Sequence, residues 1–324
     1  MSNHFSVHPA LFDPAAISAE TQAANDEFQR ATANGPNWWD VGAAAYREVA
    51  ASGKGAFPRP EKSARARTLQ IDGKGGHKIA LRVIRPEHAT GVHLFFHGGG
   101  MVFGASDVQD PMLERIVKNT GMACVSVGYR LAPEHPYPAA WDDCECAALW
   151  LVKNAKSELG TDTLTIGGES AGSTLAVATL VRLRDQHGYT GFRAASLAYG
   201  NYDASMTPSQ LRAPDPGVPV TFVGKTSLDK FREAYLSTGM DPRDPDVSPL
   251  YADLTRLPSA LFTVGTLDPL LDDSLFLSMR WLAAGNEAEL AIYPGAPHAF
   301  NSLPMPQGPP ANARIDAFLE RRLS

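Results

Sequence analysis

The chain has 324 residues, of which 44% are hydrophobic and 20% are charged, and its formal net charge is −6. The length is sufficient for one large α/β domain or a domain with a lid, and we expect a single domain over residues 1–324. The composition is that of a soluble globular protein and excludes a disordered chain. The negative charge balance argues against a nucleic-acid partner, and no apolar run approaches the roughly 18 residues that a membrane span needs.

The first residues and the cysteines bear on location. Met1 to Leu11 contain neither a basic region nor an apolar stretch, so we expect no secretory leader. The three cysteines are odd in number and lack the spacing of a disulfide framework, which favours reduced thiols in a cytoplasmic protein. A metal site built from the Cys144-x-Cys146 pair and His135 is a poorer interpretation than plain packing, and we expect no metal or cofactor.

The N-terminal segment is predicted to form two helices ahead of the core. Asp13-Pro14 is a typical helix start, and the first helix carries Ile17 and Phe28 on one face. A second helix is expected from Trp39 through Tyr46 to Gly53. A loop at 34–37 separates the two helices, and a basic, solvated linker at 58–67 follows the second.

The rest of the chain alternates between strands and helices. Residues 65–71 and 78–84 predict an antiparallel hairpin. Further strands are expected at 92–96, 123–127, 164–169, 194–199, 260–264 and 289–293, and helices at 112–119, 139–159, 273–284 and 312–322. Residues 208–257 break the alternation, are rich in Pro and Asp, and contain one helix candidate at 227–236. The pattern predicts a mostly parallel, doubly wound sheet with helices on both faces.

One serine lies between a predicted strand and a predicted helix. Gly168-x-Ser170-x-Gly172 fits the nucleophile elbow, a turn so tight that glycine is needed at its flanks. The turn would lift Ser170 above the sheet edge, beside a helix N-terminus with unpaired N–H donors. By itself the G-x-S-x-G pattern is common, so other parts of the chain must support a catalytic role.

A nucleophilic serine needs a base and an acid that orients the base. Asp268 and His298 each follow a predicted late strand, in the chain order serine, acid, histidine that this architecture requires. Because the carboxyl ends of parallel strands meet at one edge of the sheet, we expect Ser170, Asp268 and His298 to meet there.

A glycine triplet follows the predicted strand at 92–96. His97-Gly98-Gly99-Gly100 lets the backbone approach a ligand and aim N–H groups at it. A phosphate-binding loop is disfavoured, because no Gly-Lys-Ser/Thr follows. A simple flexible turn is the other interpretation of the triplet when it is taken alone.

Together these motifs resemble the hormone-sensitive-lipase-like carboxylesterases. The resemblance rests on His97-Gly98-Gly99-Gly100, the serine elbow, the run Tyr129-Arg130-Leu131-Ala132-Pro133-Glu134, Asp268-Pro269-Leu270-x-Asp272 and His298-x-Phe300. It implies an α/β-hydrolase fold with a helical cap, made here by residues 1–60 and about 204–257. It also implies a small-molecule ester substrate of short to medium acyl chain, and a possible homodimer.

The resemblance further implies roles for single residues. Gly99, Gly100 and Ala171 would donate backbone N–H groups to the oxyanion. His97, Arg130, Glu134 and Asp143 would hold loops by hydrogen bonds and ion pairs. The chain departs from the family at Glu169 and Ser173, where Asp and Gly are usual, and at Met101, where an aromatic residue is frequent.

Several questions stay open on the sequence alone. An amidase or lactonase would use the same three residues, and a non-catalytic binder of small ligands could share the fold. A lipase for long chains is disfavoured, since no long amphipathic lid is evident. Met101, Phe103, Trp38 and Trp39 are candidate substrate-binding residues, and Phe222 and Phe231 are further candidates in the cap; each is either pocket wall or ordinary packing.

Overall fold

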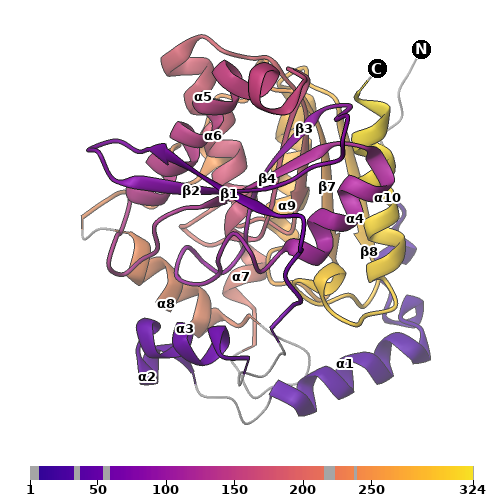
Figure 1. Ribbon diagram of the computed structural model, residues 1–324. Helices are drawn as coiled ribbons and strands as arrows, with labels where there is room; N and C mark the ends of the chain where they lie inside the picture. Colours follow the sequence, from indigo (N-terminus) through magenta and orange to yellow (C-terminus); the bar gives the residue numbers. More distant parts are fainter. Residues whose placement is uncertain (1–6, 33–36, 54–58, 215–222, 237–238, 324) are drawn as a thin grey trace.

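A computed structural model describes residues 7–32, 37–53, 59–214, 223–236 and 239–323. Within these residues, eight strands form one sheet in the order β1-β2-β4-β3-β5-β6-β7-β8 (Figure 1). Their bounds are β1 Arg67–Asp72, β2 Lys78–Ile84, β3 Val92–Phe96, β4 Ala123–Gly128, β5 Leu164–Glu169, β6 Phe192–Ala198, β7 Ser259–Gly265 and β8 Ala288–Tyr293. β2 pairs antiparallel with β1 and β4, and all other pairs are parallel, which confirms the predicted mostly parallel sheet.

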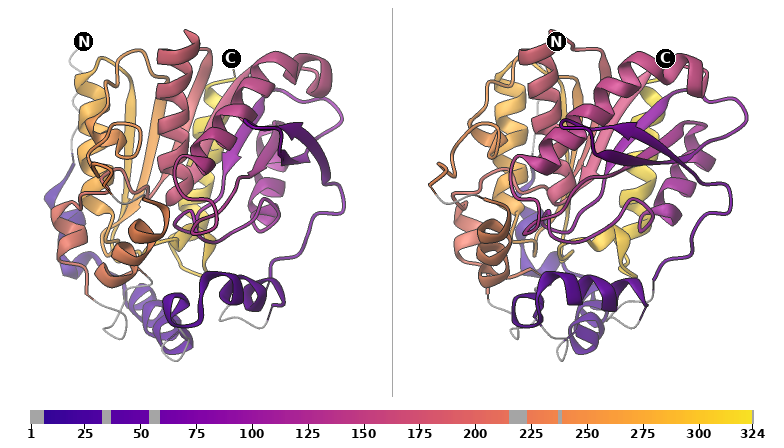
Figure 2. Two further views of the ribbon diagram at one scale, coloured as in Figure 1. Left: turned by 90° about the vertical axis from the view of Figure 1, so that its left-hand side faces the viewer. Right: turned by 60° about the vertical axis from the view of Figure 1, so that its left-hand side comes forward.

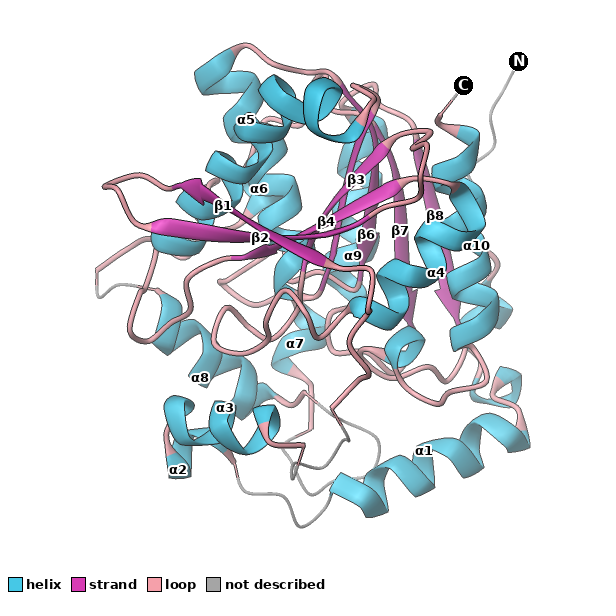
Figure 3. Ribbon diagram, in the orientation of Figure 1, coloured by secondary structure: helices cyan, strands magenta, loops and turns pink. Residues whose placement is uncertain are grey.

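Helices cover both faces of the sheet (Figures 2 and 3). One face carries α5 (Ala139–Leu159), α6 (Ala171–His187) and α9 (Leu271–Ala283), and the other carries α4 (Asp110–Thr120) and α10 (Gly308–Arg321). All five residues of β3 are buried, as expected for a strand that is covered on both sides. Among the described helices, none has the length and apolar character needed to cross a membrane.

A second group of helices lies along the edge where the parallel strands end (Figure 1). It comprises α1 (Ala19–Thr32), α2 (Trp38–Val41), α3 (Ala43–Ala51), α7 (Pro208–Leu211) and α8 (Lys225–Tyr235). Two parts of the chain that are far apart in sequence thus meet over the same edge of the sheet: the helices within 19–32 and 37–51, and those within 208–214 and 223–235. The described part of the chain also contains four short 3₁₀ helices, at Pro9–Phe12, Pro14–Ala16, Pro249–Tyr251 and Phe300–Ser302.

The N-terminal predictions need two corrections. The first helix does not start at Asp13, because this side chain accepts a hydrogen bond from the Ala15 N–H (2.8 Å) and caps a 3₁₀ turn instead. The second predicted helix is two helices, separated at Gly42, whose φ of +90° interrupts the helical backbone. Most of the predicted loop at 34–37 and the start of the linker at 58 lie outside the described residues. In the rest of the linker, ion pairs join Arg59 and Lys62 to Asp107 and Arg65 to Glu114.

One buried histidine lies in the centre of the sheet. His93 of β3 is paired in register with Thr165 of β5, and its Nδ1 lies 2.9 Å from Oγ1 of that threonine. Burial lowers the pKa of His93 to about 3, and the nearby charge of Arg115 adds to the effect. The folded protein therefore holds this imidazole neutral at pH values where an unfolded chain would protonate it.

We expect His93 to make the fold sensitive to acid. Between pH 6.5 and about 3, the unfolded state binds a proton at His93 that the folded state does not, so the free energy of unfolding falls as the pH falls. The slope is about 1.4 kcal/mol per pH unit for one such group. In urea unfolding measured from pH 6.5 to 4.5, the free energy of unfolding of His93→Gln should depend on pH less steeply than that of the wild type, by this amount. Equal slopes for the variant, the wild type and the exposed control His88→Gln would contradict this origin.

Candidate active site

Ser170 occupies the sharp turn between β5 and α6. Its backbone has φ 53° and ψ −121°, a left-handed conformation that a non-glycine residue rarely adopts. The Ser170 N–H donates to the Ala198 carbonyl (2.9 Å), which fixes the turn against the end of β6. The serine side chain is thereby displayed at the carboxyl edge of the sheet.

The turn packs against the end of β3 without room for side chains. A Cβ added at Gly172 would lie 1.9 Å from the Phe96 carbonyl oxygen, so the first turn of α6 rests directly on the neighbouring strand. Ser173 stands where the related family usually has glycine. Its Oγ lies 2.6 Å from the Gly168 carbonyl and 2.9 Å from the Ala198 carbonyl, so the extra hydroxyl binds the turn to β6.

The predicted base and acid lie beside the serine. Nε2 of His298 is 2.9 Å from Oγ of Ser170, and Nδ1 of His298 is 2.9 Å from Oδ2 of Asp268. His298 and Asp268 are only 4% and 3% exposed, which keeps this pair out of bulk water. A serine, an imidazole and a carboxylate in this hydrogen-bonded order have the geometry that serine activation requires.

Glu169 connects the elbow to the segment that follows His298. Its buried carboxylate accepts hydrogen bonds from Gln109 Nε2 (2.8 Å) and Ser302 Oγ (3.0 Å), and a longer one from Asn301 Nδ2 (3.4 Å). Burial raises the pKa of Glu169, while the hydrogen bonds from Ser302 and Asn301 oppose the rise. The longer side chain, where the family usually has Asp, thus ties the turn before Ser170 to the turn after His298.

The loops around the glycine triplet are held by polar contacts. His97 Nδ1 lies 2.8 Å from the Gly98 carbonyl, and the Tyr129 hydroxyl donates to the His97 carbonyl (2.7 Å). Burial lowers the pKa of His97 to about 4, so its imidazole is neutral in this setting. Arg130 forms a bidentate pair with the fully buried Asp143 (2.8 and 2.9 Å). These are the loop-holding contacts that the family resemblance implies.

A small cavity of about 30 Å³ opens beside the Ser170 hydroxyl. Its lining comprises Gly100, Met101, Ser170, Ala171, Thr174, Asn201, Val223, Leu228, Phe231, Tyr235, Leu270 and His298. Of the predicted oxyanion residues, Gly100 and Ala171 belong to this lining and Gly99 does not. Such a volume holds little more than one water molecule, far below the several hundred Å³ of common ligand pockets.

The predicted substrate-binding residues divide between the cavity and its surroundings. Met101 lines the cavity, whereas Trp38, Trp39 and Phe103 are not among its lining residues. Trp38 instead stacks on Phe231 (ring centroids 5.4 Å apart) and meets Phe103 and Trp39 edge to face, at 5.4 and 5.9 Å. Phe222 lies outside the described residues.

The sequence reasoning missed most of the cavity wall that comes from α8. Leu228, Phe231 and Tyr235 recur at helical spacing on one side of this helix and face the cavity together. The amphipathic pattern of 227–236 contained this signal, but it did not say which surface the helix covers. Phe231 also lies against the glycine triplet: a Cβ at Gly100 would lie 2.3 Å from its Cδ1.

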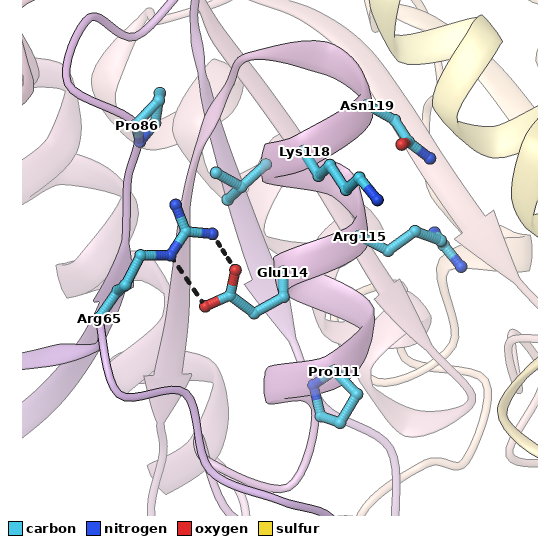
Figure 4. Close-up of a pocket in the computed structure, with 8 residues that line it drawn as sticks. Arg65, Pro86, Pro111, Glu114, Arg115, Lys118 and Asn119 are labelled. Atoms are coloured by element: carbon cyan, nitrogen blue, oxygen red, sulfur yellow. Dashed lines mark hydrogen bonds and ion pairs between the residues drawn. The ribbon is translucent and has the colours of Figure 1, made fainter.

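A larger surface depression, about 660 Å³, lies elsewhere on the described residues, between the start of β1 and helix α4 (Figure 4). Its described lining residues are Arg65, Pro86, Pro111, Glu114, Arg115, Val117, Lys118 and Asn119, and the Arg65–Glu114 ion pair crosses it. None of these lining residues is a serine, cysteine or histidine. The depression therefore offers no serine or cysteine nucleophile paired with a histidine, whereas the smaller cavity contains Ser170 and His298 and is the candidate active site.

Comparison with known proteins gives the family. A family profile described as "alpha/beta hydrolase fold" matches residues 93–302, more than half of the chain. The chain belongs to the alpha/beta-hydrolase family. The matched region contains the glycine triplet, the serine elbow, Asp268 and His298. The match and the relatives below confirm the resemblance to hormone-sensitive-lipase-like carboxylesterases.

Relatives of this alpha/beta hydrolase include named ester hydrolases. It is 32% identical over 254 residues to carboxylic ester hydrolase LipN of Mycobacterium tuberculosis, covering 76% of this chain and 67% of that one. It is 30% identical over 240 residues to ethyl acetate hydrolase of Pseudomonas putida, covering 72% and 74%. A hyperthermophilic esterase from the archaeon Pyrobaculum calidifontis superposes with a TM-score of 0.82 at 29% identity, over 92% of this chain and 96% of that one.

The close approach at Gly172 gives a testable expectation. Gly172→Ala should favour the helix by about 1 kcal/mol from propensity, yet its methyl group collides with the Phe96 carbonyl oxygen. We expect a net loss of about 2 kcal/mol or more in the free energy of unfolding, measured by urea titration. Gly308→Ala, at the start of α10, is the control, because this glycine has no positive φ and its Cβ would come no closer than 3.3 Å to another atom. An unfolding free energy for Gly172→Ala equal to the wild-type value would contradict the packing described here.

Proposed function

We propose that the protein hydrolyses carboxylic esters through an acyl-enzyme formed on Ser170. The observation that carries the proposal is the continuous hydrogen-bonded series from Ser170 Oγ to His298 (2.9 Å) and from His298 to Asp268 (2.9 Å). The series lies in a cavity at the carboxyl edge of the sheet, where ligands bind in open α/β folds. The ester-hydrolase names of the relatives support the same reaction class.

In the proposed reaction, His298 Nε2 accepts the Ser170 proton as the hydroxyl oxygen attacks the ester carbonyl carbon. Asp268 stabilises the imidazolium and keeps the proton on Nδ1. Backbone N–H groups of Gly99, Gly100 and Ala171 donate to the oxyanion, and each such donor is worth about 3 kcal/mol of barrier. His298 then protonates the leaving alcohol, and water hydrolyses the acyl-serine with the same imidazole as base.

The proposed substrate is a small ester. The described lining leaves a cavity of only about 30 Å³ beside Ser170, which disfavours a long acyl chain. The proposed cap comprises residues 1–60 and about 204–257, and two contacts support it: α8 lines the cavity, and Trp38 of α2 stacks on Phe231 of α8. The relative from Pseudomonas putida is named for ethyl acetate, an ester of this size.

We also propose a cytoplasmic location. All three cysteines are free, and Cys124 and Cys144 are buried, which suits a reducing compartment. The homodimer implied by the family resemblance stays a prediction, which light scattering of the purified protein would test.

Replacing the nucleophile tests the proposed chemistry. Ser170→Ala should lower kcat for nitrophenyl acetate by a factor on the order of 10⁶, because the covalent route is lost. It should also abolish the pre-steady-state burst of nitrophenol. Ser157→Ala, at an exposed position of α5, is the matched control and should keep both. A folded Ser170→Ala protein with a burst and wild-type turnover would overturn the proposal, and a panel with the matched amide and lactone identifies the preferred bond.

The cavity wall gives a prediction about acyl-chain length. Phe231→Ala should raise the ratio of kcat/KM for nitrophenyl hexanoate to that for nitrophenyl acetate by about tenfold or more, since pockets discriminate single methylenes by such factors. Phe276→Ala removes a partly exposed phenylalanine of α9 that does not line the cavity, and should leave the ratio unchanged. An unchanged ratio in a folded Phe231→Ala protein would show that this ring does not limit chain length.

A further inference from the structure

The loop that carries the proposed oxyanion donors is a short turn after β3. The N–H groups of Val102 and Phe103 both donate to the Gly99 carbonyl, at 3.0 and 2.8 Å. The Ala132 N–H donates to the Met101 carbonyl (2.8 Å), so the loop after β4 supports this turn from outside. The shape of the turn determines where the amides of Gly99 and Gly100 point. The Gly99 carbonyl that closes the turn belongs to the same planar peptide unit as the Gly100 N–H.

One side chain from the N-terminal segment reaches both loops. Arg47 of α3 donates from Nη1 to the Val102 carbonyl (3.0 Å) and to the Ala132 carbonyl (3.2 Å). Its Nη2 pairs with the Glu134 carboxylate, which belongs to the same loop as Ala132. A single planar guanidinium thus joins α3 to the glycine-triplet turn and to the loop that supports it.

The surroundings of Arg47 make the loss of these hydrogen bonds energetically costly. Val102 and Ala132 are 0% and 1% exposed, so their carbonyl groups lie in a buried part of the backbone where an unpaired acceptor is costly. The neighbouring Tyr46 packs on Phe103 with ring centroids 4.8 Å apart, which brings α3 to the same turn by an apolar contact. Bonds from a charged donor are shorter and stronger than neutral ones, and the fork of arginine can serve several acceptors at once.

We propose that Arg47 is a positioning residue for the oxyanion hole: it fixes the Val102 and Ala132 carbonyls and thereby the direction of the Gly99 and Gly100 amides. The inference rests on the proposed function and adds a second role for the N-terminal segment. In this role, α3 supplies the group that holds the turn rigid. Rigid donors stabilise developing charge best, since no reorganisation is then needed in the transition state.

The alternative is that Arg47 simply fastens α3 to the core. Arg59 provides a control for that role, because it also attaches α3 without touching the glycine-triplet turn. Its Nη1 donates to the Ala51 carbonyl at the end of α3 (3.0 Å), and its Nη2 pairs with Asp107 (2.9 Å). If both arginines only attach α3 to the core, replacing either one should change kcat to the same extent. If Arg47 orients the oxyanion donors, only its replacement should lower kcat.

The test compares Arg47→Met, Arg47→Lys and Arg59→Met in hydrolysis of nitrophenyl acetate. Methionine keeps the apolar stem and removes the donors. Loss of one oxyanion donor lowers kcat by roughly 100-fold or more, so misaimed donors in Arg47→Met should lower it by about 10- to 100-fold. KM should stay within about twofold, because the interaction strengthens in the transition state. Arg47→Lys should recover part of the lost kcat, and Arg59→Met should keep the wild-type kcat.

Two results would overturn the proposal. One is a wild-type kcat in folded Arg47→Met. The other is an equal fall of kcat in Arg47→Met and Arg59→Met, which would indicate simple attachment. If Arg47→Met does not fold, Arg47→Lys provides the test. Lysine retains the charge but cannot form the two-armed hydrogen bonding of arginine, so kcat should fall below the wild-type value, by less than expected for Arg47→Met, at unchanged KM. A wild-type kcat in Arg47→Lys would then overturn the proposal. A wild-type protein without ester hydrolysis would instead reject the proposed function, and that result is distinct from any pattern among these variants.

Discussion

The hydrogen bond between Ser170 Oγ and His298 Nε2 joins residues 128 positions apart, and it depends on where three parallel strands end. β5 delivers the serine, β7 precedes Asp268 and β8 precedes His298, all at one edge of the sheet. A shift of any of these strands by one residue would move a side chain to the opposite face. The buried, two-sided packing of the sheet is therefore what makes the arrangement of the three side chains possible.

Contacts within the loops determine the final positions of the side chains that the sheet brings to this edge. The turn at Ser170 has a strained backbone, and the contact between Gly172 and the Phe96 carbonyl shows how closely α6 must approach β3 to hold that turn. Glu169 then binds the segment after His298 through Ser302. The two departures from the usual family pattern, Glu169 and Ser173, are thus both used for hydrogen bonds that fix the elbow, so they preserve its geometry by other means.

Much of this was predictable from the sequence, for physical reasons that can be named. Helix α5 has its predicted bounds, because a proline precedes it and Gly160 ends it in the left-handed conformation. The break at Gly42 was missed, since a single glycine within a helical pattern does not reveal its φ. The contacts of Phe231 and Arg47 were also beyond reach: they join segments 55 or more residues apart, and periodicity says which face of a helix is apolar but not what it covers.

The central claim is that one sheet edge brings the Ser170 hydroxyl, the His298 imidazole and the loop amides to a common point. A crystal structure of the protein treated with a phosphonate ester tests it most directly. We expect phosphorus bonded to Ser170 Oγ, with one phosphonyl oxygen within about 2.7–3.1 Å of the backbone nitrogens of Gly99, Gly100 and Ala171. An adduct on another residue, or one on Ser170 whose oxygens all point away from these amides, would contradict the claim.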